Sequence, residues 1–209
     1  MTLIGNLFSS PLSTLIFLLS IIIAITVHEF AHAWTAVRLG DDTPLHQGRV
    51  TLNPLAHLDP IGSLFFLLFR FGWGKPVIYD PRNLNRRVDE LLIALAGPAS
   101  NLLLAFILNL ATFLQVKTGI TLIQSDILGL IIQINVFLAA FNLVPIPPLD
   151  GSSIVAYFWP EYRSLAGGQV GTILIILLIL PLGGSNLLGI IVNPIANFFF
   201  QLVTLFGLI

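Results

Sequence analysis

Four long stretches of the chain contain no charged residue, and they constrain the fold more than any other feature. They cover residues 1–27, 91–116, 127–149 and 164–209. A helix needs about 20 mostly apolar residues to cross the roughly 30 Å of hydrocarbon in a bilayer, and each stretch reaches that length. Only 9% of the residues are charged and the mean hydropathy is +0.96, whereas soluble domains carry about 25% charged residues. We therefore expect an integral membrane protein in direct contact with the lipid bilayer.

The last uncharged stretch is too long for a single span. Residues 181–186 read Pro-Leu-Gly-Gly-Ser-Asn, which is typical of a turn between two helices. The predicted fold is an all-α polytopic membrane protein, one domain over residues 1–209, with about five spans at 11–35, 91–116, 127–147, 167–182 and 187–209. The apolar piece between Asp59 and Arg70 is too short to cross and predicts a re-entrant or interfacial segment.

The basic residues indicate an orientation in the membrane. Most lie between the first two predicted spans: Arg38, Arg49, Arg70, Lys75, Arg82, Arg86 and Arg87. Because Lys and Arg accumulate in cytoplasmic loops, we expect the N-terminus outside and both residues 38–90 and the C-terminus in the cytoplasm. We also expect the membrane to be the cell membrane of a prokaryote. The net charge of −1 and the pI near 6.4 lack the basic excess of a nucleic-acid-binding protein, so nucleic acid is excluded as a partner.

The region between residues 38 and 90 contains two candidate strands. Residues 48–53 alternate in part between apolar and polar side chains and stop at Pro54, and Trp73 with residues 77–79 suggests a second strand. A solvated connector without strands is the alternative interpretation of both segments.

His28, Glu29 and His32 form the clearest chemical motif, His-Glu-Phe-Ala-His, at the end of the first uncharged stretch. On a helix, the two imidazoles lie on one face and can reach the same metal ion, while Glu29 lies beside them as a candidate base. An ionisable group in mid-bilayer costs on the order of 3 kcal/mol, so three of them in five residues need compensation. A bound metal ion would provide this compensation, and a structural histidine cluster without metal is the alternative interpretation.

A catalytic zinc site normally has three protein ligands, and the chain has no cysteine. Asp150 is the best candidate for the third ligand because it directly follows an uncharged run whose three prolines stop the third helix. The first and third spans are both expected to run inward, which brings His28, His32 and Asp150 to one depth. Asp150 as the N-cap of the following helix is the alternative.

These two motifs together resemble the site-2 protease family of intramembrane zinc metalloproteases. The second motif is Asn-x-x-Pro-x-Pro-x-Leu-Asp-Gly at residues 142–151, and residues 96–101 and 48–53 are also similar to that family. The resemblance implies a compact member without a PDZ or cystathionine-synthase-type domain, which cleaves transmembrane protein substrates. It also implies that His28, His32 and Asp150 bind one Zn²⁺ and that Glu29 is the catalytic base.

Hydrolysis of a peptide also requires donors for the developing oxyanion. The side-chain amides of Asn142 and Asn101 are the candidates, and packing between helices is the alternative for Asn101. An exposed edge at residues 48–53 could pair with an unwound substrate. The competing function is a membrane metal transporter or metal-binding membrane protein, with the same three ligands holding an ion in transit. The sequence does not indicate an oligomeric state.

Overall fold

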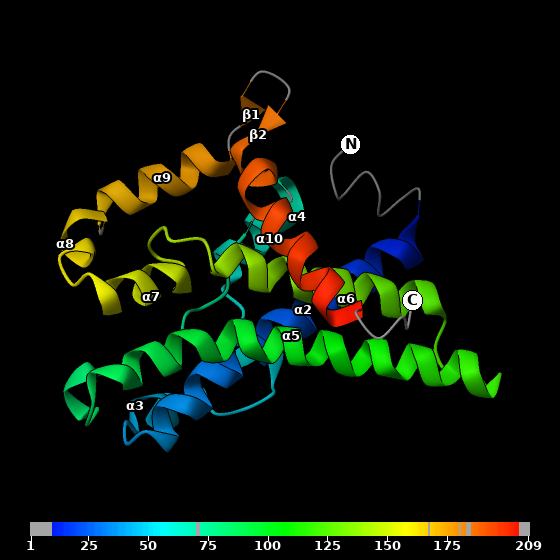
Figure 1. Cartoon of the computed structure of the whole chain (residues 1–209), viewed down its shortest axis with the longest axis horizontal. Coiled ribbons are helices and arrows are strands. Elements are labelled where there is room, and N and C mark those ends of the chain that lie inside the picture. Colours follow the sequence, from blue (N-terminus) through cyan, green and yellow to red (C-terminus); the bar gives the residue numbers. More distant parts are fainter. Residues whose placement is uncertain (1–9, 70–71, 167, 180, 183–184, 205–209) are drawn as a thin grey trace.

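Helices make up most of the computed structural model, which describes residues 10–69, 72–166, 168–179, 181–182 and 185–204 (Figure 1). Four helices within these ranges are long and apolar enough to cross a membrane: α2 (Pro11–Arg38), α5 (Arg87–Thr118), α6 (Ser125–Asn142) and α10 (Leu187–Thr204). They confirm four of the predicted spans. The remaining one corresponds to α9 (Gln169–Ile179), whose eleven residues are shorter than a span requires, and residues 167, 180 and 205–209 of the predicted spans lie outside the described ranges.

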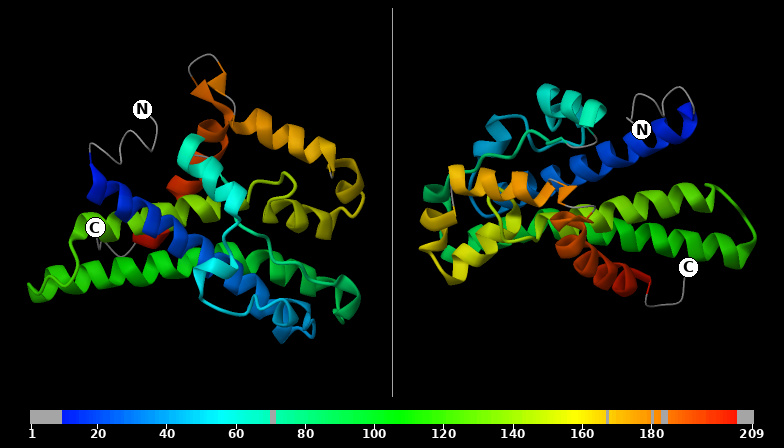
Figure 2. Two further views of the ribbon diagram at one scale, coloured as in Figure 1. Left: turned by 180° about the vertical axis from the view of Figure 1, so that it is seen from behind. Right: turned by 90° about the horizontal axis from the view of Figure 1, so that it is seen from above.

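Helices α5 and α6 form an antiparallel pair, with α2 on one side and α10 on the other (Figure 2). Helix α2 runs in the same direction as α6, as predicted for the first and third spans (Figure 1). Where α2 meets α5, small residues lie in the contact: the Asn101 amide reaches Ala24 O, and Gly97 lies against His28 and His32. Small side chains allow helices to approach closely, which is how helices associate in lipid.

The third predicted span ends earlier than expected. Helix α6 stops at Asn142, five residues short of the predicted end at 147, because Pro145 and the prolines after it cannot continue a helix. The chain then turns back tightly to α7 (Asp150–Phe158). A Cβ atom at Gly151 would lie 2.3 Å from the carbonyl oxygen of Leu143, so this turn has room only for glycine.

The connector between α2 and α5 contains only short helices in its described part. They are α3 (Thr43–His46), η1 (Pro54–Ala56), α4 (Pro60–Phe69) and η2 (Pro81–Asn83). The ten residues of α4 correspond to the short apolar piece that was expected not to cross. Helix α8 (Tyr162–Ala166) precedes α9. After α9, two antiparallel strands of two residues each, β1 (Pro181–Leu182) and β2 (Ser185–Asn186), occupy the predicted turn before α10.

The expected strands at residues 48–53 and 77–79 are not formed. Residues 48–53 adopt turns and bends, and 77–79 have no regular structure; in the described part of this connector, the pairing is one isolated bridge between Leu58 and Gly74. In residues 48–53, local hydrogen bonds use backbone groups that a strand would pair. Gly48 N donates to Leu45 O, Arg49 N to Pro44 O and Thr51 N to Arg49 O, and the His57 imidazole bonds to Thr51 O.

Candidate metal centre

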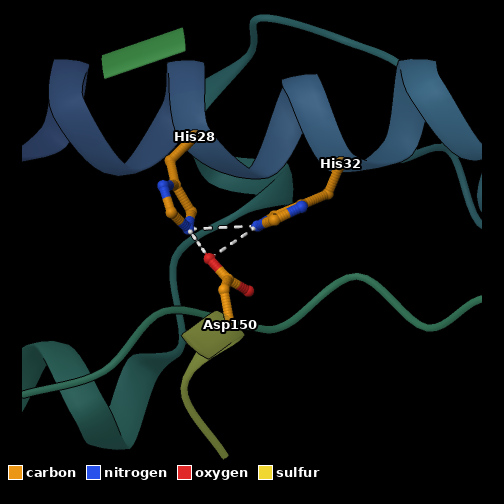
Figure 3. A group of neighbouring side chains, drawn as sticks. All are labelled: His28, His32 and Asp150. Carbon is orange, nitrogen blue, oxygen red and sulfur yellow. Dashed lines mark hydrogen bonds and ion pairs between the residues drawn. The ribbon is translucent and has the colours of Figure 1, made fainter. Parts of the chain in front are cut away.

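Three side chains from two distant parts of the chain, His28 and His32 of α2 and Asp150 of α7, meet at one point (Figure 3). The Nε2 atoms of His28 and His32 lie 3.1 Å apart. Asp150 Oδ2 lies 3.1 Å from His28 Nε2 and 3.3 Å from His32 Nε2. The structure thus brings together the three residues that the sequence singled out as metal ligands. Asp150 is the first residue of α7 and the N-cap position is occupied by Leu149, so the geometry does not favour the N-cap alternative.

The donor set fits a zinc ion. His28 Nδ1 lies 2.8 Å from Asn101 Oδ1 and His32 Nδ1 lies 2.7 Å from Ile93 O. Since both partners are acceptors, each Nδ1 carries the proton and each Nε2 presents a lone pair. Asp150 Oδ2 is buried and accepts no hydrogen bond within the described residues. Ligand atoms about 2.0–2.2 Å from a tetrahedral zinc lie about 3.3–3.6 Å apart, close to the distances found.

Helix α5 makes room for the two imidazoles. A Cβ atom at Gly97 would lie 2.3 Å from His32 Nε2 and 2.7 Å from His28 Nε2, both far below a normal contact distance. The rings of His28 and His32 therefore lie directly over the bare backbone of α5 at Gly97. Nothing in the local sequence pattern distinguishes this glycine from a packing residue, and sequence reasoning missed it.

Glu29 lies on α2 between the two histidines but is not one of the three clustered ligands. Its Oε2 accepts a hydrogen bond of 3.0 Å from Val77 N and lies 3.9 Å from Arg49 Nη2. The side chain is 15% exposed, so a water molecule can reach it. The Val77 backbone and the Arg49 guanidinium, both in the connector between α2 and α5, thus hold the Glu29 carboxylate in place.

Arg49 is buried and ties the connector together beside Glu29. Its guanidinium donates to the backbone carbonyls of Ala56 and Lys75. Burial lowers the pKa of Arg49 below its usual value, while the neighbouring Glu29 carboxylate opposes that shift. Sequence analysis treated Arg49 only as one of several basic residues that indicate orientation. The available signal was a charge immediately after a glycine, in a segment that has no other Asp, Glu, Lys or Arg between Asp42 and Asp59.

The two candidate oxyanion donors differ in their burial and in the hydrogen-bond partners of their side-chain amides. Asn101 is fully buried in α5; its Oδ1 faces His28, and its Nδ2 donates to Ala24 O at 3.0 Å and to Asn135 Oδ1 at 2.8 Å. Asn142 is half-buried at the end of α6, where its Nδ2 donates to Leu138 O of the same helix. The amide hydrogens of Asn101 are therefore committed to other helices, whereas those of Asn142 are bound only within its own.

An apolar cavity of about 890 Å³ lies among α2, α4, α6 and α10. Its lining includes Ala24 and Ile25, which lie about one helical turn before His28, and Phe141, which lies next to Asn142. The cavity thus extends through the apolar part of the fold to the neighbourhood of the clustered ligands.

Comparisons with known proteins identify relatives of the chain. The family model described as Peptidase family M50 matches residues 116–182. "Putative zinc metalloprotease YwhC" of Bacillus subtilis is 42% identical over 153 residues, which cover 69% of this chain and 70% of the relative. "Putative zinc metalloprotease Rip2" of Mycolicibacterium smegmatis is 32% identical over 191 residues, 87% of this chain and 69% of the relative. "Putative zinc metalloprotease MJ0611" of Methanocaldococcus jannaschii is 30% identical over 162 residues, 74% and 78% of the two chains. No solved structure matches the chain.

Proposed function

The chain belongs to peptidase family M50, and from this membership we propose that it binds zinc through His28, His32 and Asp150. It is an intramembrane zinc metalloprotease, and metal transport is not favoured. The observation that carries the ligand assignment is the convergence of two imidazole nitrogens and one carboxylate oxygen, 3.1–3.3 Å apart, at a buried point. Zinc bound there supplies Lewis-acid chemistry, polarising a peptide carbonyl and acidifying water.

Glu29 acts as the general base in this proposal. Its carboxylate takes a proton from the attacking water and afterwards delivers it to the leaving amine. The hydrogen bond from Val77 N and the nearby Arg49 guanidinium support this role, because they fix one carboxylate oxygen and leave the other for the proton. Both contacts come from the connector, so its folded state supports catalysis as well as packing.

Asn142 is the better of the two candidate oxyanion donors. Its amide is half-buried and bonded only to Leu138 O in its own helix, a bond that it can exchange for one to substrate. Asn101 has no amide hydrogen left for that purpose, because both of its amide contacts are with buried acceptors. We assign Asn101 to orienting His28 instead.

The substrate is a membrane protein, and its apolar segment is proposed to bind in the 890 Å³ cavity. A transmembrane helix hides its carbonyls in backbone hydrogen bonds, so the segment has to unwind where the cavity approaches His28. The concentration of basic residues between α2 and α5 supports an orientation with the N-terminus outside and the site toward the cytoplasm, in one domain spanning residues 1–209.

The decisive test compares the native chain with Glu29→Gln in lipid nanodiscs. We expect Glu29→Gln to keep about one zinc ion per chain and to lose about 10²- to 10⁴-fold in the rate of cleavage of single-span substrates, the usual contribution of a general base. Glu161→Gln, which neutralises an exposed glutamate in the same way, is the control and should cleave normally. Normal cleavage by Glu29→Gln would refute the assignment of the base, and unchanged zinc content in His28→Ala would refute the ligand assignment.

A further inference from the structure

A chain of buried amide groups links the zinc ligand His28 to helix α6. His28 Nδ1 faces Asn101 Oδ1 at 2.8 Å, and Asn101 Nδ2 donates to Asn135 Oδ1 at 2.8 Å. Asn135 Nδ2 in turn donates to Ile131 O at 2.8 Å. Asn101 and Asn135 are both fully buried. The three side chains come from α2, α5 and α6, and Asn135 is not one of the three clustered residues.

The direction of each hydrogen bond follows from the last one. The carbonyl of Ile131 can only accept, so the amide nitrogen of Asn135 faces it and the amide oxygen of Asn135 faces Asn101. That oxygen and the carbonyl of Ala24 both require donors, so the Asn101 nitrogen points at them and the Asn101 oxygen points at His28. An oxygen at that position requires a proton on His28 Nδ1 and leaves the lone pair on Nε2.

We propose that Asn135 is a positioning residue, which fixes the amide of Asn101 and thereby the tautomer and ring orientation of His28. The proposal rests on the assignment of His28 as a zinc ligand. Partners of this kind are needed because a ligating histidine binds metal well only when its other nitrogen is held by an oriented acceptor. Without Asn135, the Asn101 amide keeps only Ala24 O as an acceptor for its two hydrogens, and its orientation loses one of two constraints.

The position of Asn135 also distinguishes it from an ordinary packing residue. A polar side chain inside an apolar span is costly and is typically found where it has a specific partner. Helix α6 leads directly into the turn that carries Asp150, so the amide chain connects the helix before the third ligand to the first ligand. Asn109 of α5 is a suitable comparison, since it is equally buried and its Nδ2 donates to Val203 O of α10 at 3.0 Å, remote from the cluster.

The test is a double-mutant cycle on the full-length chain in nanodiscs. The variants are Asn135→Leu, Asn101→Leu and the double variant, with Asn109→Leu as the matched control; leucine is close to asparagine in size. Zn²⁺ affinity is measured by competition with a chromophoric chelator, and the ligand geometry is followed in the visible spectrum of bound Co²⁺. Thermal unfolding without metal is recorded for all variants, and Asn135→Ala replaces Asn135→Leu if the latter does not fold.

We expect Asn101→Leu to weaken Zn²⁺ binding about 10- to 100-fold and Asn135→Leu about 10-fold, the range for partners that orient a ligating histidine. The double variant should be within about twofold of Asn101→Leu, because Asn135 acts only through Asn101. Both Asn135→Leu and Asn101→Leu should alter the Co²⁺ spectrum, and Asn109→Leu should alter neither quantity.

Two results would overturn the proposal while leaving the proposed function intact: native Zn²⁺ affinity in Asn135→Leu, or losses that add in the double variant. Equal losses in Asn135→Leu and Asn109→Leu would also overturn it, because they would mean a general packing effect. Failure of the native chain and Asn109→Leu to bind Zn²⁺ at all would instead refute the zinc assignment on which it rests.

Discussion

Replacing Gly97 by alanine should separate metal binding from folding. Alanine is favoured over glycine inside a helix by about 1 kcal/mol, so on helix propensity alone Gly97→Ala would stabilise α5. At this position, however, the new methyl group would lie 2.3 Å from His32 Nε2 and 2.6 Å from His28 Cε1. The substitution therefore acts directly on the rings of both histidine ligands.

The size of the effect follows from these distances. An ordinary contact of a Cβ atom begins at 3.4 Å, so the His32 ring has to move by about 1 Å, whereas metal sites tolerate ligand shifts of about 0.2 Å. The ring cannot pivot freely, because His32 Nδ1 is bonded to Ile93 O, one turn before Gly97 on the same helix. We expect Zn²⁺ affinity to fall by about 100-fold or more, in line with the effect of a 1 Å misplacement in a catalytic site.

Zn²⁺ affinity, cleavage rate and thermal unfolding of the metal-free chain provide the assay. Gly129→Ala is the matched control, because it makes the same change in α6 where a Cβ atom would meet nothing within 4 Å. Gly97→Ala should bind Zn²⁺ poorly, with the strain on the rings offsetting the gain in helix propensity. Gly129→Ala should bind Zn²⁺ and cleave like the native chain and should unfold at the same or a slightly higher temperature, because alanine is favoured in a helix. Native Zn²⁺ affinity in Gly97→Ala would show that the rings have another place to go and would refute the reasoning.

Two further substitutions test other parts of the structure. Asn142→Ala should keep its zinc and slow cleavage about 10²- to 10³-fold at saturating substrate, the usual cost of losing an oxyanion donor; an unchanged rate would exclude that role. Burial alone would raise the pKa of Asp41, but hydrogen bonds from Thr43 and Asn83 outweigh it and keep the pKa below its usual 3.8. Asp41→Asn should therefore lower the free energy of unfolding by about 1–3 kcal/mol at pH 7. Because the folded pKa is depressed, this difference should persist above pH 3.8 and disappear as the pH falls through the lower folded value. The exposed neighbour Asp42 is the control, and equal effects of Asp42→Asn would contradict the assignment.

The convergence of His28, His32 and Asp150 could be predicted because ionisable groups are costly in apolar surroundings. His28 and His32 follow twenty-seven uncharged residues, and Asp150 follows an equally uncharged run, so each stood out from its surroundings. The early end of α6 was only partly predictable: the prolines indicated that the helix stops, but not that it stops at Asn142. Helix α9 was predicted as part of a span over residues 167–182 from composition alone, and its described residues, Gln169–Ile179, are fewer than a span requires.

The connector between α2 and α5 was not predictable from its sequence pattern. Residues 48–53 alternate like a strand, but the Arg49 guanidinium donates to the carbonyls of Ala56 and Lys75 outside this segment, and the His57 imidazole bonds to Thr51 O within it. The contacts of Asn101 could not be predicted for a related reason. An amide can donate or accept, and its direction is set by Ala24 and Asn135 on two other helices, information that no local pattern carries.

Helix α5 provides no metal ligand, yet it determines how the histidine ligands are arranged. Ile93 O holds His32, Asn101 holds His28, and Gly97 leaves the space between them. These three residues are four apart along the helix, so they form one face that lies against α2. Because these contacts come from a carbonyl, an amide and a bare backbone that are not among the proposed ligands, each can be altered without removing a ligand. Variants on this face should therefore change the geometry of the site in graded steps, whereas changes at the ligands themselves abolish it.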